Sequence, residues 1–284
     1  MAQKPAYPRR KVELVKGTVY AYLGYEAAHP QANIGVVNTS DGVIFIDCNT
    51  RHAHDLVNEM RAANRPIRFL IHTHSHWDHV TGNSLFSQAG AVIIASEACH
   101  RNMIEYGEDH YTSRVKLRSP DREVVPTLLP DLTFSERMTV HLGGEEIQLL
   151  FFGPAHTSDN IVVFLPQHGV LFTGDLLFYL NHCVLKQYSH PNPLHWPLVL
   201  DRLYQLPASV VVPGHGPLTN KEGLKLFQDY LVTFRQRVAD LMAKGKTLEE
   251  IKGTIDLSEY ASWRHQEMVP EDIEGMYLSL KGKA

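Results

Sequence analysis

Cysteine is scarce in this chain, as are long apolar runs and dense blocks of positive charge. Only three of the 284 residues are cysteines, and their odd number and wide spacing argue against a disulfide framework. No apolar run reaches the length that a bilayer requires, so we expect no membrane segment. The formal net charge is −4 and the basic residues form no dense patch, so we expect no nucleic-acid partner.

The first residues, Met1 to Pro5, lack the apolar core of a secretory signal. We therefore expect a cytoplasmic protein, or a periplasmic one if a signal has been trimmed. The chain also lacks a Gly-x-Ser-x-Gly sequence, which argues against a serine nucleophile on an α/β-hydrolase elbow. The hydrophobic fraction of 44% and the charged fraction of 20% are typical of a globular protein.

Histidine, in contrast, is abundant, with 17 residues. The run His74-Ser75-His76-Trp77-Asp78-His79 directly follows an apolar segment that predicts a strand. Crowding these polar side chains without a shared partner would leave buried nitrogens and a carboxylate unsatisfied. Because neutral imidazole and carboxylate are common metal ligands, this loop predicts a bound cation.

The hydrophobic pattern predicts two similar halves, each running from strands to helices. Asp41-Gly42 predicts a hairpin turn, residues 52–64 and 97–106 predict helices, and residues 107–130 predict a polar, irregular excursion. Sheets inside and helices outside make an α/β sandwich of four layers, αββα, the expected fold. We expect a catalytic domain over residues 1–220 and a helical extension over residues 221–284 that packs on the same domain.

Three further segments each carry one metal-binding side chain in a turn that follows or ends a predicted strand. They are Gly153-Pro154-Ala155-His156-Thr157-Ser158-Asp159-Asn160, Thr173-Gly174-Asp175 and Gly214-His215-Gly216. Side chains at strand ends converge at the edge of a sheet, so these segments and the histidine run can meet.

With these motifs in this order, the chain resembles the metallo-β-lactamase superfamily. The resemblance implies a four-layer sandwich and two adjacent metal sites. It implies that His74, His76 and His156 hold the first ion. It implies that Asp78, His79 and His215 hold the second and that Asp175 bridges both. Two Zn²⁺ are the expected cofactors, with iron or manganese as alternatives.

By the same resemblance, the expected reaction is hydrolysis of a small molecule by a hydroxide held between two ions. Asp78 is the expected catalytic residue, which binds one ion and orients the hydroxide. Asp47 is expected to hydrogen-bond the histidine loop without binding metal, although a strand-end cap is an equally good interpretation. Trp77, His182, Lys186 and His190 are candidates for the substrate pocket.

The substrate class stays open between three alternatives. The turn around His156 resembles that of true β-lactamases and favours a cyclic amide or ester, either a β-lactam or a lactone. The bridging Asp175 resembles glyoxalase II, a thioesterase whose anionic substrates would need cations such as Lys186, Arg114 or Lys116. An iron-dependent oxidoreductase on the same fold is a third interpretation. The apolar spacing of residues 224–234 predicts core packing, with a homodimer contact as the alternative.

Overall fold

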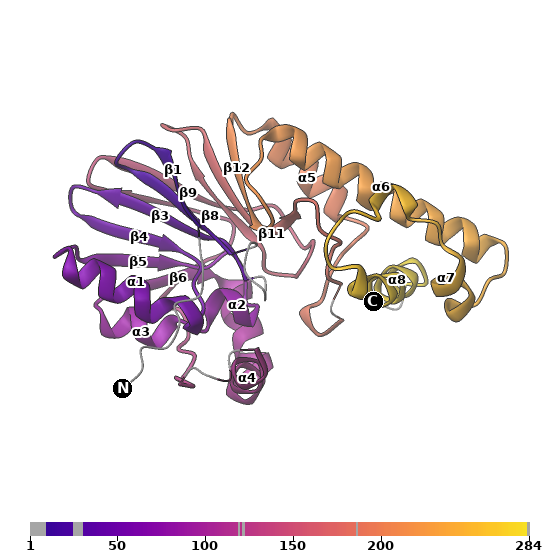
Figure 1. Cartoon of the computed structure of the whole chain (residues 1–284), viewed down its shortest axis with the longest axis horizontal. Helices are drawn as coiled ribbons and strands as arrows, with labels where there is room; N and C mark the ends of the chain where they lie inside the picture. The colour runs from indigo at the N-terminus through magenta and orange to yellow at the C-terminus, as the bar shows by residue number, and fades with distance from the viewer. Residues whose placement is uncertain (1–9, 25–30, 119, 121–122, 186, 283–284) are drawn as a thin grey trace.

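The computed structural model describes residues 10–24, 31–118, 120, 123–185 and 187–282. Within them, the strands form two sheets that lie face to face, with helices on the outer faces (Figure 1). This arrangement confirms the predicted four-layer sandwich. No helix among the described residues has the length and apolarity needed to cross a bilayer.

The first sheet combines a meander with parallel strands. Its first four strands pair antiparallel, and the remaining strands add in parallel through helical crossovers. In spatial order the strands are β1 (Arg10–Val15), β2 (Val19–Leu23), β3 (Ile34–Thr39), β4 (Gly42–Ile46), β5 (Ile67–Ile71), β6 (Val92–Ser96) and β7 (Leu132–Phe134). The turn between β3 and β4 confirms the hairpin predicted at Asp41-Gly42.

The second sheet is antiparallel except for its last pair, β11 and β12, which run parallel. Its strands in spatial order are β12 (Val210–His215), β11 (Val170–Phe178), β10 (Ile161–Leu165), β9 (Glu145–Phe151) and β8 (Arg137–Leu142). The two sheets share one apolar layer, in which Ile44 and Ile71 of the first sheet belong to the same buried cluster as Val163 and Phe172 of the second.

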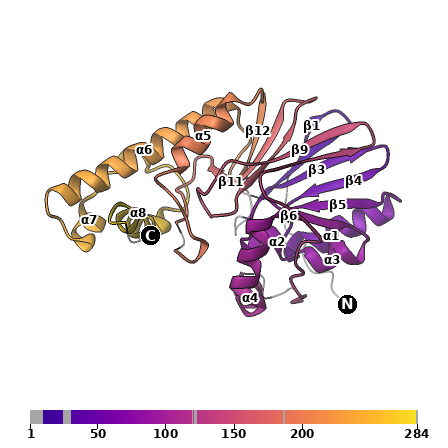
Figure 2. The same ribbon diagram turned by 180° about the vertical axis from the view of Figure 1, so that it is seen from behind.

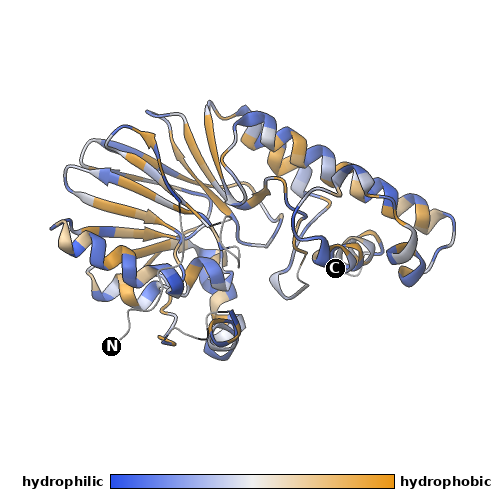
Figure 3. Cartoon of the chain, viewed as in Figure 1, coloured by the Kyte–Doolittle hydropathy of each residue, from blue (hydrophilic) through white to orange (hydrophobic). Residues whose placement is uncertain are grey.

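Helices with one apolar face cover both sheets, and their outward faces are hydrophilic (Figure 3). The helices of the first half are α1 (Thr50–Ala62), α2 (Trp77–Val80), α3 (Asn83–Gln88) and α4 (Glu97–Arg118). Those of the second half are α5 (Trp196–Gln205), α6 (Lys221–Ala243), α7 (Leu248–Thr254) and α8 (Val269–Leu280). Single 3₁₀ turns lie at η1 (Gln187–Ser189), η2 (Ser258–Tyr260) and η3 (Gln266–Met268).

Helix α4 corrects one prediction. The helix predicted over residues 97–106 is present and is interrupted at Gly107, whose φ of 71° and ψ of 165° are not helical, but a second helical part follows to Arg118 where an irregular segment was expected. Tyr111 and Val115, one turn apart, are buried against the domain and hold the second part in place. Because the other residues of this part are mostly polar, its amphipathic pattern looked like a loop. Among the described residues of the expected excursion, only those that follow Arg118 lie outside this helix.

The C-terminal helices extend away from the sandwich (Figure 2). The predicted apolar face of α6 is buried, and its residues Leu224, Phe227, Leu231 and Phe234 join Trp196 and Leu200 of α5 in one cluster. Core packing is thereby confirmed for this face. The division of the chain at residue 220 and the homodimer stay predictions.

Candidate metal centre

The side chains predicted to bind metal come from strand ends in both sheets. The histidine run follows β5 and opens α2, and His156 lies in the turn between β9 and β10. Asp175 lies within β11, and His215 ends its parallel neighbour β12. Both views place α2 and β11 on the side of the sandwich that faces the C-terminal helices (Figures 1 and 2). Segments up to 141 residues apart in sequence thus meet at one edge, from His74 to His215.

The first group contains three fully or almost fully buried imidazoles. The ring centroids of His74 and His76 are 4.7 Å apart, and the ring of His156 lies 5.3 Å from His74 and 4.7 Å from His76. The Nε2 atom of His156 is 3.0 Å from Nδ1 of His76. Asp175 Oδ2 lies 3.6 Å from His74 Nε2 and 3.4 Å from His156 Nε2. Four potential ligands therefore converge on one point.

The second group shares the same aspartate. Asp78 Oδ2 lies 3.3 Å from Nε2 of His215 and 3.9 Å from Nε2 of His79. The other carboxylate oxygen of Asp175, Oδ1, lies 3.3 Å from His79 Nε2 and 3.4 Å from His215 Nε2. One oxygen of Asp175 thus faces each group, which is the arrangement that a bridging carboxylate needs.

The electrostatics of the two groups differ. Burial lowers the pKa of His156 to about 4 against the opposing charge of Asp175, and burial also holds the pKa of His74 and His76 well below the usual value. Burial also opposes protonation of His215, but Asp175 and Asp78 outweigh it and raise its pKa to about 10. The carboxylates of Asp78 and Asp175 therefore stabilise a positive charge in the second group, and either a proton or a metal ion can provide it.

The hydrogen-bond pattern tests whether these residues fit a metal. Among the described residues, His74 Nε2, His79 Nε2 and Asp175 Oδ1 are buried within the cluster and make no hydrogen bond of normal geometry, although the last two atoms lie 3.3 Å apart. Buried polar atoms without partners are rare in native proteins and call for an explanation, such as an ion. Neutral imidazole and carboxylate in sets of three or four suit a divalent cation, and zinc in particular. The residues of both groups fit one ion each.

Asp47 and Thr73 fix the orientation of two imidazoles. Asp47 Oδ2 lies 2.8 Å from Nδ1 of His79 and accepts a 2.7 Å hydrogen bond from the Thr73 hydroxyl. Thr73 Oγ1 in turn lies 3.1 Å from Nδ1 of His74. These hydrogen bonds form a relay from His79 through Asp47 and Thr73 to His74. When Nδ1 of each imidazole carries the proton and donates it to the relay, Nε2 of each imidazole is unprotonated and faces the cluster. Asp47 thus acts on one residue of each group.

Two polar residues outside the predicted set hold the other segments in place. Asp159 accepts a hydrogen bond from the Ser75 backbone at 2.9 Å and another from the Thr157 hydroxyl, which ties the His156 turn to the histidine loop. Asn33 donates from Nδ2 to the carbonyl oxygens of Pro213 and Gly216, both at 2.9 Å. Asn33 gave no sequence signal because it lies far from the turn that it supports.

Glycine is required at two positions beside the cluster. A Cβ atom at Gly214 would lie 2.0 Å from Oδ1 of Asp175, and one at Gly174 would lie 2.4 Å from the Thr73 hydroxyl oxygen. Gly174 also has a φ of 50°, which side chains rarely adopt. The two Gly-containing motifs therefore keep space for Asp175 and for the relay through Thr73.

Comparison with known proteins agrees with this geometry. The family model described as the metallo-beta-lactamase superfamily matches residues 29–215, well over half of the chain. The chain belongs to the metallo-beta-lactamase superfamily.

Relatives that match the chain include metallo-beta-lactamases and a linear primary-alkylsulfatase. The chain is 27% identical to metallo-beta-lactamase IND-1 of Chryseobacterium indologenes over 189 residues, which are 65% of this chain and 71% of the relative. It is 24% identical to the linear primary-alkylsulfatase of a Pseudomonas strain over 261 residues, which are 78% of this chain but 49% of the relative. The chain thus spans about half the length of the alkylsulfatase.

A similar solved structure is the metallo-beta-lactamase from Pontibacter korlensis. It superposes with a TM-score of 0.63 at 26% identity and covers 79% of this chain and 99% of its own. The superfamily match ends at residue 215, so α6 to α8 lie outside it.

The predicted pocket residues have different surroundings. Trp77, half-buried, packs with Tyr106 against the start of α4. His190 is exposed, and its Nε2 lies 3.0 Å from Oε1 of Glu105. His182 is fully buried against Tyr230 and is not brought to the metal groups. Lys186 lies outside the described residues.

Sequence reasoning did not single out Tyr188 of η1. Its ring centroid lies 5.9 Å from that of His76, so it stands directly beside the first group. The neighbouring sequence has no strand or helix periodicity that would have placed it there. Superfamily motifs also gave no signal, since Tyr188 lies between the motif residues Asp175 and His215.

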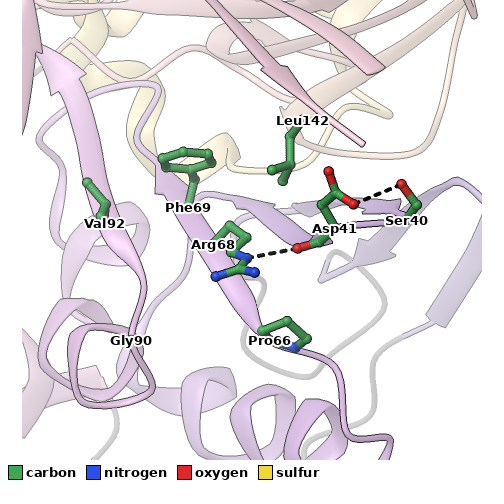
Figure 4. A pocket seen from close by; sticks show the side chains of 8 residues that line it. All are labelled: Ser40, Asp41, Pro66, Arg68, Phe69, Gly90, Val92 and Leu142. Carbon is green, nitrogen blue, oxygen red and sulfur yellow. Dashed lines mark hydrogen bonds between the residues drawn. The ribbon is translucent and has the colours of Figure 1, made fainter. Parts of the chain in front are cut away.

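A separate groove of about 720 Å³ lies at the opposite ends of the strands (Figure 4). Its lining includes Asp41 before β4, Pro66 before β5 and Val92 at the start of β6, whereas the metal groups follow the other end of β5. Arg68 closes one side by donating from Nε to the carbonyl oxygen of Asp41 at 2.8 Å. This groove therefore contributes nothing to the metal centre.

Proposed function

We propose that this protein is a dinuclear zinc hydrolase that cleaves a cyclic amide or ester, of β-lactam or lactone type. The observation that carries the proposal is the placement of Asp175 between the two groups, with one carboxylate oxygen toward each. A pair of ions bound there would lower the pKa of a water molecule toward about 7 and stabilise the negative charge that develops on the substrate.

The residues of the second group face the substrate in this proposal. The side chains of Asp78 and His215 are 14% and 12% exposed, whereas those of His74, His79 and His156 are fully buried. Substrate would therefore approach from the side of Asp78. Burial opposes ionisation of Asp78, but His79 and His215 outweigh it and lower its pKa to about 2. The carboxylate thus stays ionised and can accept a hydrogen bond from the attacking water, which orients it.

The supporting residues keep this arrangement fixed. Asp47 and Thr73 hold the imidazoles of His79 and His74 in one orientation, so little reorganisation is needed when substrate binds. Phe178 stacks on His215 at 5.5 Å with an interplanar angle of 6°, which limits rotation of the more exposed ring.

A second candidate is hydrolysis of a sulfate ester, because the chain is related over 78% of its length to a linear primary-alkylsulfatase. Both reactions would use the same residues, and they differ in the bond that is cleaved. A thioesterase and an iron-dependent oxidoreductase are the other outcomes that a test must separate.

The proposal is tested by a screen of zinc-loaded protein on a lactam, a lactone, a thioester and an alkyl sulfate, with metal content measured on the same sample. We expect turnover of the lactam or lactone that a chelator removes and that the His76→Ala variant lacks. Turnover of only the sulfate ester would favour the second candidate. Bound iron together with oxygen consumption, or no zinc-dependent turnover of any substrate, would overturn the proposal.

A further inference from the structure

Two hydrogen bonds tie helix α4 to the loops that carry ligands of the first metal group. The hydroxyl of Tyr111 donates to the carbonyl oxygen of Ser75, within the histidine run, at 3.1 Å. Asn102 donates from Nδ2 to the hydroxyl of Ser158, in the turn of His156, at 3.0 Å. Both parts of the kinked helix are thus anchored to loops that carry candidate metal ligands.

Tyr188 fills the space between α4 and the metal group. Its ring centroid lies 5.9 Å from that of His76, 5.4 Å from that of Tyr106 and 5.1 Å from that of His110. The carbonyl oxygen of the next residue, Ser189, accepts a 3.1 Å hydrogen bond from the backbone of Ser158. The aromatic ring is therefore held beside the cluster from two sides.

Arg114 places a cation on this aromatic wall. Its guanidinium carbon lies 6.0 Å from the centroid of Tyr188, and its side chain is half-buried. No carboxylate in the described part of the chain forms an ion pair with Arg114. Close by, Nε2 of His110 is buried and has no hydrogen-bond partner among the described residues. Within the part of the chain that the structure describes, the wall thus holds one positive charge without an ion-pair partner and one buried polar atom that a ligand can satisfy.

We propose that Arg114 and Tyr188 form the specificity wall of this hydrolase and select substrates that carry an anionic group attached to an apolar or aromatic part. Arg114 binds the anion and Tyr188 packs against the apolar part, so both are substrate-binding residues. This inference rests on the function proposed above, since it assumes that a substrate which enters from the side of Asp78 extends past Tyr188 and Arg114. A guanidinium suits carboxylate and sulfate alike, because both present paired oxygens to its donors.

The first test measures binding without metal, so that no ion can attract the anion. Metal-free protein is titrated with phenylacetate and with phenylacetamide, a neutral molecule of nearly the same shape, and binding is followed by saturation-transfer NMR. The natural protein is expected to prefer phenylacetate. Arg114→Gln is expected to lose that preference, with phenylacetate binding roughly ten-fold weaker or more, as for other hydrogen bonds to charged groups. Arg101→Gln is the matched control, because Arg101 is exposed on the same helix and pairs with Glu97.

The aromatic role has its own pair of variants. Tyr188→Ala is expected to weaken the binding of both phenylacetate and phenylacetamide. Tyr188→Phe keeps the aromatic ring and is expected to bind both molecules as tightly as the natural protein does. Circular dichroism and zinc uptake of each variant show whether the fold and the metal centre persist.

A second test uses the zinc-loaded enzyme with one lactam as its free acid and as its methyl ester. In Arg114→Gln, kcat/KM is expected to fall roughly ten- to hundred-fold for the acid and little for the ester. Carboxylate and sulfate as the anion are separated by repeating the binding test with benzyl sulfate. The inference is overturned if metal-free natural protein shows no preference for phenylacetate, or if Arg114→Gln keeps it. Absence of all hydrolysis would instead overturn only the proposed function.

Discussion

Replacing Asp47 with asparagine tests how the buried relay controls metal binding. Asp47 is 2% exposed, and its φ of 58° is one that asparagine also tolerates, so Asp47→Asn keeps the shape and the backbone. The substitution replaces a carboxylate oxygen, which accepts hydrogen bonds, with an amide NH₂ group or a weaker carbonyl acceptor.

The consequence for His79 follows from its tautomer. Asp47 Oδ2 lies 2.8 Å from Nδ1 of His79, which favours a proton on Nδ1 and a bare Nε2. An amide NH₂ at the same place favours the opposite tautomer, in which Nε2 carries the proton and cannot bind metal. Loss of such an orienting partner typically costs about 10- to 100-fold in metal affinity, or about 1.4–2.7 kcal/mol. We expect this loss chiefly at the second group, because His74 is reached only through Thr73.

The assay is a competition titration of zinc against a chromophoric chelator, which resolves two classes of site. Asp41→Asn is the matched control, because Asp41 is an exposed turn residue at the other end of the strands. The natural protein and the control are expected to bind both ions with the same affinities, and Asp47→Asn is expected to bind one of the two ions at least ten-fold more weakly than the natural protein does. Equal affinities in all three proteins would refute the relay. A matching loss at both sites would show that Asp47 supports the whole loop rather than one imidazole.

Three further predictions concern metal removal, glycine and a helix cap. Chelation of zinc is expected to lower the melting temperature, since an ion at about 100 times its Kd stabilises the fold by about 2.7 kcal/mol; an unchanged melting temperature in calorimetry would contradict it. Gly214→Ala is expected to abolish binding of at least one ion, because the added Cβ would lie 2.0 Å from Asp175 Oδ1. Gly253→Ala in α7 is the control, because its Cβ meets no atom within 4 Å, and it is expected to stabilise the fold by about 0.5–1 kcal/mol. Thr247→Ala removes a capping box and is expected to lower the free energy of unfolding, measured by urea titration, by about 1 kcal/mol. Hydrogen bonds from the backbone of Thr247, and then from the side chains of Lys246 and Thr247, lower the pKa of Glu250 from 4.5 to about 2. The stability that the ionised Glu250 contributes is therefore present above pH 4.5 and lost as the pH falls toward 2. Glu250→Gln is expected to remove this pH dependence.

Much of the fold could be predicted from the sequence, because its signals are local. The Asp41-Gly42 turn fixes one hairpin, and the capping hydroxyl of Ser96 accepts a hydrogen bond from the Cys99 backbone at the predicted start of α4. The same holds for the predicted metal-binding residues, since each lies in a turn or at a strand end that its own neighbours specify. Parallel and antiparallel pairing then brings those segments to one edge without any further information in the motifs.

What could not be predicted depends on contacts between distant segments. The second part of α4 is held against the domain by Tyr111 and Val115. Because its other residues are mostly polar, hydrophobic periodicity predicted an irregular segment there instead of a helix. Asn33 supports the His215 turn from more than 180 residues away, and no local pattern marks such a partner. Tyr188 lies in a single turn of 3₁₀ helix whose position depends on Ser158, so only the folded chain brings it to the metal centre.

The central claim, that two ions share Asp175, is tested most directly by locating the metal in crystals of the zinc-loaded protein. Anomalous scattering at the zinc edge is expected to give two peaks about 3.5–4 Å apart, each within bonding distance of one oxygen of Asp175. A single peak at full zinc saturation, or a second peak that Asp175 does not reach, would contradict the account.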